Sequence, residues 1–142
     1  MYSITFKMVS LYFDGASRSN PGPASYGGVF YKDGKELYTY KKYIGTTTNN
    51  VAEYKALISG LLMAKEKGIK DLEVYGDSKL VIEQVTGHWK VKSRSLVTFH
   101  REICALLLER PFETISFQHI YRKHNKRADE LANEALDDAL LS

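Results

Sequence analysis

Two apolar segments of this chain each run directly into an aspartate, and this pattern limits the possible folds more than any other feature. Tyr12 and Phe13 precede Asp14, and the segment DLEVYG (71–76) precedes Asp77. Both segments are short and rich in β-branched and aromatic residues, which is typical of buried strands. A carboxylate is costly where a buried strand ends unless something compensates its charge. We therefore expect a fold that brings both aspartates to one place.

Alternating and helical periodicities along the chain predict five strands and four helices. The strands are expected at 4–13, 25–31, 35–44, 71–76 and 113–120, and the helices at 51–67, 78–85, 93–109 and 128–140. The Asp33-Gly34 pair signals a hairpin turn between the second and third strands. Three consecutive strands, followed by strands that alternate with helices, predict an α/β domain with a five-stranded mixed sheet and helices on both faces.

The same order predicts where the two aspartates lie. The helix after the third strand can return the chain so that the fourth strand lies parallel to the first. Ligands of such sheets bind outside the carboxyl ends of the strands, where the strand order reverses. If Asp14 ends the first strand and Asp77 ends the fourth, their side chains are neighbours at that position.

Composition sets wider limits. The 142 residues are 44% apolar and 26% charged, which is typical of one globular domain over 1–142, and the net charge of +3 is no argument for nucleic acid by itself. The single cysteine, Cys104, excludes an internal disulfide and fits a reducing compartment, so we expect a cytoplasmic protein. Cys104 lies in the apolar run 103–108, which predicts a buried, unreactive thiol. The sequence has no recognisable secretory signal or membrane span, so no membrane partner is expected.

Two further acids extend the pair to four. Glu53 lies near the start of the 51–67 helix on its sheet-facing side, and Asp129 begins the last helix beside its apolar stripe. Asp14, Glu53, Asp77 and Asp129 are therefore expected to converge. Neighbouring carboxylates repel one another, and divalent cations resolve that conflict. Mg²⁺ prefers oxygen ligands, and two ions about 3.5–4 Å apart can clamp the attacking and leaving oxygens of a phosphoryl transfer.

Each acid also has a structural explanation that needs no metal. Asp14 can start a turn before a glycine. Glu53 has the spacing of a capping-box partner for Asn50. Asp77 can cap the helix that follows it. Asp129 can be a solvated charge favoured by the helix dipole. Taken one at a time, these explanations compete with the metal site, and only the convergence of all four acids favours the metal.

Four stretches of the chain carry a family resemblance. They are YFDGASRSNPGPASYGGV, TTTNNVAEYKALISGL, VYGDSKLVIEQVTGHWKVK and RKHNKRADELANEAL, and in this order they cover almost the whole chain. With this set the chain resembles a type 1 ribonuclease H, in the short form without a hybrid-binding domain found in archaeal and bacterial relatives. The resemblance implies a ribonuclease H-like fold. It also implies that Asp14, Glu53, Asp77 and Asp129 are catalytic metal ligands.

The resemblance further implies an activity. The expected enzyme is an endoribonuclease that hydrolyses the RNA strand of RNA/DNA hybrids with two Mg²⁺ ions, for which Mn²⁺ can substitute. It leaves 5′-phosphate and 3′-hydroxyl ends and cleaves double-stranded RNA weakly. Two alternatives stay open, namely a nucleic-acid-binding module of the same fold without catalysis and a different metal nuclease or transferase. We expect a monomer and, because the first strand begins close to Met1, a complete small enzyme.

Polar residues near the acids are candidate substrate contacts by the same resemblance. Asn20, Asn49 and Asn50 are candidates for RNA sugar hydroxyls and base edges, and Thr48 for a phosphate of the DNA strand. The small polar segment 15–20 would let a nucleic-acid backbone approach closely. Hybrids are read through shape, phosphates and the 2′-hydroxyl, which suits such groups. Helix capping alone is the competing explanation for TTTNN.

Two segments depart from the usual family pattern. In the short loop YRKHNKRAD, His124 is a candidate auxiliary catalytic residue, while Lys123 or Arg122 stands where many relatives carry a histidine. In GHWKVKSR, Trp89 and Lys90 are candidates to stack on and neutralise the DNA strand. The competing explanations are a solvent-exposed loop histidine and packing of Trp89 against the following helix. We expect modest, salt-dependent affinity.

Overall fold

The computed structural model describes residues 8–141, and the expected order of strands and helices is confirmed within that range. The strands are β1 (Val9–Ser17), β2 (Gly22–Lys32), β3 (Lys35–Thr47), β4 (Asp71–Gly76) and β5 (Thr114–His119). The helices are α1 (Asn49–Glu66), α2 (Lys79–Val85), α3 (Arg94–Leu108), the short 3₁₀ helix η1 (Arg122–His124) and α4 (Lys126–Leu141). The basic segment expected as a loop therefore includes one helical turn.

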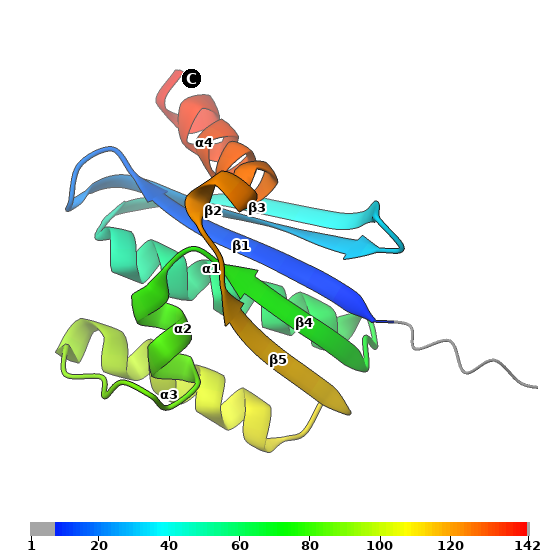
Figure 1. The fold of residues 1–142 in the computed structure, drawn as a ribbon. Helices are drawn as coiled ribbons and strands as arrows, with labels where there is room; N and C mark the ends of the chain where they lie inside the picture. The colour runs from blue at the N-terminus through cyan, green and yellow to red at the C-terminus, as the bar shows by residue number, and fades with distance from the viewer. Residues whose placement is uncertain (1–7, 142) are drawn as a thin grey trace, which may run out of the picture.

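The five strands form one mixed sheet with the order β3-β2-β1-β4-β5. β1 runs antiparallel to β2 and parallel to β4, and β5 extends the parallel part of the sheet. Helix α4 covers one face, while α1, α2 and α3 lie on the other (Figure 1). The α/β architecture with a five-stranded mixed sheet and helices on both faces is confirmed.

The first strand differs from its prediction at the carboxyl end. We expected residues 4–13, of which 4–7 lie outside the described residues, and the observed strand continues to Ser17. Asp14 therefore lies inside β1 and pairs with Gly27 of β2, so the prediction that Asp14 ends the strand is wrong. Only the parallel ladder with β4 ends there, at the pair Phe13 and Gly76. Since the antiparallel ladder with β2 continues, Asp14 is held by one neighbouring strand where the other separates.

The core lies between the sheet and α1. Leu11 and Phe13 of β1 and Val74 of β4 point toward this helix and are fully buried. Leu57 and Leu61 meet them from α1 and are also inaccessible to solvent. Side chains alternate across a strand, so Tyr12 and Asp14 point to the opposite face, toward α4. The strand position of Asp14 is thus fixed by Leu11 and Phe13, which precede it and are buried in the core.

Cys104 is exposed, so the prediction of a buried thiol is wrong. The apolar run around it belongs to α3, and a surface helix buries only one stripe of its circumference. Leu96, Ile103 and Leu106 form that stripe and are the buried residues of this helix. Cys104 falls on the outer side, where its sulfur lies 3.8 Å from Nδ1 of His100. A continuous apolar run did not reveal which of its residues would face solvent.

Among the helices of the described residues, none is both long enough and apolar enough to cross a membrane.

Candidate active site

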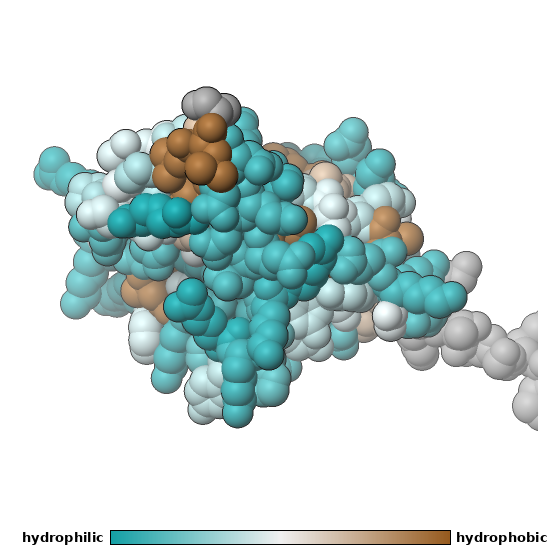
Figure 2. Space-filling model, turned by 90° about the horizontal axis from the view of Figure 1, so that it is seen from above, coloured by the Kyte–Doolittle hydropathy of each residue, from teal (hydrophilic) through white to brown (hydrophobic). Residues whose placement is uncertain are grey.

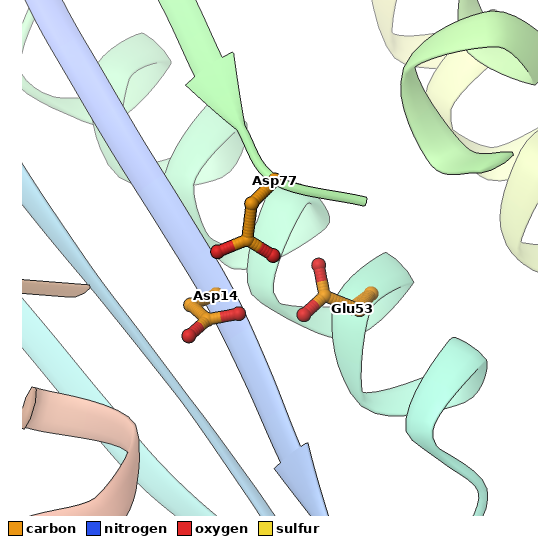
Figure 3. A group of neighbouring side chains, drawn as sticks. All are labelled: Asp14, Glu53 and Asp77. Carbon is orange, nitrogen blue, oxygen red and sulfur yellow. The ribbon is translucent and has the colours of Figure 1, made fainter. Parts of the chain in front are cut away.

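Three acidic side chains meet beside the end of the parallel ladder. Asp14 comes from β1, Asp77 follows β4, and Glu53 comes from α1, and the three carboxylates point toward one another (Figure 3). One carboxylate oxygen from each lies within 4.8 Å of the others. Asp14 is 4% exposed and Glu53 is 2% exposed, whereas Asp77 is partly exposed. The structure therefore brings together three of the four acids that the sequence singled out.

Gly15 explains how Glu53 reaches this position. Its backbone N–H donates a hydrogen bond of 2.6 Å to Oε1 of Glu53. A Cβ at Gly15 would lie 2.5 Å from the backbone nitrogen of Glu53, so only glycine lets α1 pack this closely against β1. The close approach of nucleic acid expected along segment 15–20 stays a prediction, and at Gly15 itself the missing side chain makes room for α1.

Burial and mutual repulsion dominate the electrostatics of the site. Burial raises the pKa of the Asp14 carboxyl well above its usual range, and the nearby Glu53 and Asp77 charges add to the increase. Burial also raises the pKa of Glu53, although its hydrogen bonds with Asp14 and Gly15 oppose this. Asp14 and Glu53 titrate together, so the pair holds a proton when no cation is present.

The donor set fits a divalent cation. Oε2 of Glu53 is buried and has no hydrogen-bond partner, which is costly for a carboxylate oxygen. Three converging carboxylates offer the hard oxygen ligands that Mg²⁺ and Mn²⁺ prefer. A cation would satisfy the orphaned oxygen and remove the repulsion that raises the pKa values. Asp14, Glu53 and Asp77 are therefore the residues that would bind a divalent cation.

Asp129 lies at the rim of the same cavity, which has a volume of about 270 Å³ and is lined by all four acids. Its side chain is 31% exposed and lies 3.5 Å from a guanidinium nitrogen of Arg122. Asn133, one turn further along α4, donates a hydrogen bond of 3.2 Å to Oδ1 of Asp129. Asp129 is thus near the three central acids, but it is ion-paired and more exposed than Asp14 and Glu53.

The structural explanations for Glu53 and Asp77 do not hold. Thr48 caps α1, since its hydroxyl accepts from the N–H of Val51 at 3.3 Å, so Glu53 is not part of a capping box with Asn50. Ser78 caps α2 in the same way, so the Asp77 carboxylate is not needed as the cap. Asp129, in the first turn of α4, remains compatible with a favourable dipole interaction.

Asn125 was missed by the sequence analysis. Its Nδ2 donates to the backbone oxygen of Phe13 at 2.9 Å and to Oδ2 of Asp77 at 3.0 Å. Asn125 is 1% exposed, and it joins the start of α4 to β1 and to the acid after β4. The available signal was an asparagine directly before a helix, which indicates a cap. No local pattern reveals that the side chain instead bonds across the sheet.

The predicted substrate residues fall into separate groups. Asn20 accepts from the backbone N–H of Asn49 at 2.9 Å, which ties the loop after β1 to the start of α1. Asn49 also lines the acidic cavity, as does Arg122. Asn50 is exposed beside Asn49 on the first turn of α1.

The remaining candidates lie outside the acidic cavity. Lys123 and His124 line a different cavity, on the other side of η1. Trp89 is 44% exposed, and Nζ of Lys79 lies 5.9 Å from its ring centroid. Lys90 is exposed next to it. The ring of Trp89 therefore keeps accessible surface together with positive charge.

Comparison with known proteins gives consistent matches. Residues 12–135 match the family model described as reverse transcriptase-like. The chain is 47% identical over 132 residues to ribonuclease HI of Halobacterium salinarum, covering 92% of this chain and 65% of that protein. It is 35% identical over 142 residues to a ribonuclease H of Sulfurovum, covering 91% of each. It is also 44% identical to a bifunctional protein of Mycobacterium tuberculosis but spans only 35% of it.

Solved structures agree with these matches. The crystal structure of the Halobacterium salinarum RNase H1 has a TM-score of 0.87 at 46% identity, covering 92% of this chain and 98% of that one. The structure of LC11-RNase H1 in complex with an RNA/DNA hybrid has a TM-score of 0.88 at 42% identity, covering 93% and 99%. Both similarities extend over nearly the whole of each chain compared.

Proposed function

We propose, from the premise that this chain belongs to the type 1 ribonuclease H family, that it hydrolyses the RNA strand of RNA/DNA hybrids. The observation that carries the proposal is the group of three converging carboxylates with an orphaned buried oxygen on Glu53. A hybrid-bound relative with a TM-score of 0.88 supports the choice of substrate. The chain spans 65% of its halobacterial relative and 35% of the mycobacterial one, so the proposal concerns this domain.

The acids would hold the metal ions, with Asp14, Glu53 and Asp77 at the centre and Asp129 at the rim. Two Mg²⁺ ions, or Mn²⁺ in their place, would supply an activated water and stabilisation of the departing 3′-oxygen. The products would then carry 5′-phosphate and 3′-hydroxyl ends.

The chain's own residues fix the geometry of the ligands. Gly15 fixes the direction of the Glu53 carboxylate through its N–H. Asn125 fixes Asp77 relative to the backbone of β1. Because both supports come from the packed core, the central carboxylates are held in place before a ligand arrives.

Substrate recognition is assigned to the exposed polar groups around the cavity. Asn20, Asn49 and Asn50 would contact the 2′-hydroxyls and base edges of the hybrid, and Thr48 a phosphate of the DNA strand. Arg122 lines the acidic cavity and would contact the phosphate next to the cut. Trp89 and Lys90 would stack on and neutralise the DNA strand further away. Their role is supported by exposure and by the positive charge of Lys79 over the Trp89 ring.

Three finer expectations are part of the proposal. Double-stranded RNA is cleaved weakly, because its A-form shape resembles that of the hybrid. Lys123 contacts the backbone of the substrate, and His124 assists proton transfer from the flank of η1. The domain, residues 1–142, acts as a monomer in a reducing compartment, the cytoplasm, which a lone thiol with no disulfide partner supports.

The test is a cleavage assay on a labelled RNA strand that is paired with DNA, paired with RNA, or single-stranded. Each substrate is incubated with Mg²⁺, with Mn²⁺ and with a chelator. Internal cuts in the hybrid that need metal and disappear in Asp77→Asn support the proposal. Asp71→Asn is the matched control, because Asp71 lies at the opposite end of β4, where its carboxylate accepts from the hydroxyl of Thr114. Equal cleavage by Asp77→Asn and wild type would contradict the proposal.

A nucleic-acid-binding module without catalysis is the competing function. It predicts hybrid binding with no metal-dependent cuts under any condition, which the same assay detects when binding is measured in parallel.

A further inference from the structure

A second cavity lies on the α4 side of the sheet, across η1 from the acids. Its volume is about 590 Å³. We call it the tyrosine cavity, and its lining residues are Ser10, Tyr12, Tyr31, Gly34, Lys123, His124, Asn125, Lys126, Arg127 and Ala128. Its floor is the open sheet face of β1 and β2, and its walls are the β2–β3 hairpin and the η1–α4 connection. This volume lies within the range of about 300–1,000 Å³ that is usual for small-ligand pockets.

The floor is a preformed aromatic surface. The rings of Tyr12 and Tyr31 meet edge to face, with centroids 5.6 Å apart. Tyr12 also stacks on Tyr75 of β4 with centroids 4.9 Å apart, so its ring is held on two sides. Tyr12 and Tyr31 remain partly exposed. Rings ordered in this way offer surface for another flat ring at little entropic cost.

The walls carry positive charge that the protein does not neutralise. Lys123 and Lys126 have no ion-pair partner among residues 8–141. Arg127, by contrast, is paired with Glu36 and Glu130. The tyrosine cavity thus combines an aromatic floor with two free cations at its rim, which is the composition of a site for a base and its phosphate.

The tyrosine cavity is next to the acidic cavity along the same strands. Tyr12 precedes Asp14 by two residues on β1, so both side chains point to the same face about 7 Å apart along the strand. Between the two cavities lies η1, with Arg122 lining the acidic side and Lys123 lining the tyrosine side. Asn125 lines the tyrosine cavity and donates to Asp77. A nucleic-acid strand leaving the acids can therefore enter the tyrosine cavity.

The surface around α4 argues against an apolar protein partner. Viewed from above in Figure 2, this side is mostly hydrophilic, with small and separate apolar areas. A duplex does not suit the cavity either, because its bases are stacked on one another and cannot stack on tyrosine. Unpaired bases can, and proteins bind single strands with aromatic platforms beside basic groups.

We propose that the tyrosine cavity binds an unpaired nucleotide of a single-stranded segment that flanks the duplex. The base stacks on Tyr12 and Tyr31, and its phosphates contact Lys123 and Lys126. This deepens the proposed function and rests on it, because it makes hybrids with single-stranded overhangs the preferred substrates over blunt ones.

The first experiment measures binding by fluorescence anisotropy in the presence of a chelator, so that no cleavage occurs. The probes are a labelled short oligothymidylate, a blunt RNA/DNA hybrid, and the same hybrid with an unpaired extension at either end. The overhang is expected to improve the Kd about fivefold or more, as stacking of one base allows. Thymidine monophosphate is the competitor that detects a site for free nucleotides. If it displaces the oligothymidylate while the overhang does not improve the Kd of the hybrid, the assignment to a single strand is overturned.

Variants then test whether the improvement in Kd that the overhang gives depends on the tyrosine cavity. In Tyr31→Leu and Lys126→Ala the ratio of blunt to overhang Kd should fall to about one. Tyr38→Leu and Lys67→Ala are matched controls, because Nζ of Lys67 lies 4.9 Å over the Tyr38 ring outside both cavities. An unchanged ratio in the cavity variants overturns the inference. Since Tyr31→Leu can fail to fold, the wild type is also photo-crosslinked to an oligonucleotide carrying 5-iodouridine. If the crosslinks form only at other residues, and none forms at Tyr12 or Tyr31, the proposed site is contradicted.

The outcomes separate the two proposals. Cleavage of blunt hybrid without oligothymidylate binding overturns the tyrosine cavity and leaves the ribonuclease. Oligothymidylate binding that depends on Tyr31, without cleavage, overturns the ribonuclease and leaves the cavity. An acidic peptide with the same net charge as the oligothymidylate is measured as well. If it binds equally tightly, the cavity selects for charge alone and the nucleotide assignment is overturned.

Discussion

The acidic cavity has two halves that are built differently. The deep half, Asp14 and Glu53, lies on β1 and α1 and is almost inaccessible to solvent. The rim half, Asp129 and Arg122, lies on α4 and η1, is partly or fully exposed and is ion-paired. Buried carboxylates without a cation cost stability, whereas exposed ion pairs contribute little either way. Of the two halves, therefore, only the deep half lowers the stability of the protein when no cation is bound.

The largest effect is expected in the deep half. Glu53→Gln removes a ligand charge while keeping the size of the side chain, and should lower hybrid cleavage by about 10³-fold, because metal ions supply several kcal/mol of charge stabilisation. The variant should be at least as stable as wild type, since a neutral amide replaces a desolvated carboxyl. Thermal unfolding and initial cleavage rates measure the two effects. Glu66→Gln, at the exposed end of the same helix, is the control.

The two halves also differed in what the sequence could predict. The acids of both were found because strand ends and helix starts are visible in the pattern of apolar residues. Gly15 and Asn125 were not understood, because their roles depend on backbone that lies 38 and 112 residues away in the chain. Asp14 was expected at a strand end, since sequence shows where the apolar pattern stops but not which of two ladders continues.

The pH dependence of stability gives the next effect. Asp14 and Glu53 have higher pKa values in the folded protein than their ordinary values of 3.8 and 4.5. A raised pKa means that the folded state binds the proton more tightly, so this stabilisation is complete below about pH 4 and is lost as pH rises through the folded pKa values. Without metal, the free energy of unfolding should therefore fall from pH 5 to pH 8.

Asp14→Asn should flatten this decline and raise the free energy of unfolding at pH 8, because the neutral amide carries no charge that burial would penalise. Urea unfolding in chelator at both pH values measures the difference. Mg²⁺ should raise the stability of the wild type more at pH 8 than at pH 5, because it competes with the proton. Parallel pH profiles for wild type and Asp14→Asn would contradict the burial argument.

Asn125 connects the two halves, and its removal should have an intermediate effect. Asn125→Ala leaves the backbone oxygen of Phe13 without this donor and frees the Asp77 carboxylate. A loss of about 1–3 kcal/mol of stability is expected for a buried polar group that loses its partner. Cleavage at saturating metal should also fall. Asn133→Ala is the matched control, since its amide bonds Asp129 on the rim. If Asn133→Ala is as destabilising as Asn125→Ala, the distinction between deep and rim supports fails.

The smallest change in stability is expected at the rim. Arg122→Ala removes the guanidinium 3.5 Å from Asp129, but the Arg122 side chain is 80% exposed, so the melting temperature should stay within about 1 °C of the wild type.

The metal dependence of hybrid cleavage should change in the same variant, which a purely structural role of Arg122 would not produce. Arg122 competes with a cation for Asp129, so the variant should need less Mg²⁺ for half-maximal cleavage. It should also bind the hybrid less tightly and with a weaker salt dependence, because one phosphate contact is lost. Arg101→Ala, on the exposed side of α3, is the control for loss of one positive charge. An unchanged Mg²⁺ requirement together with a large drop in melting temperature would mean that the rim is built like the deep half after all.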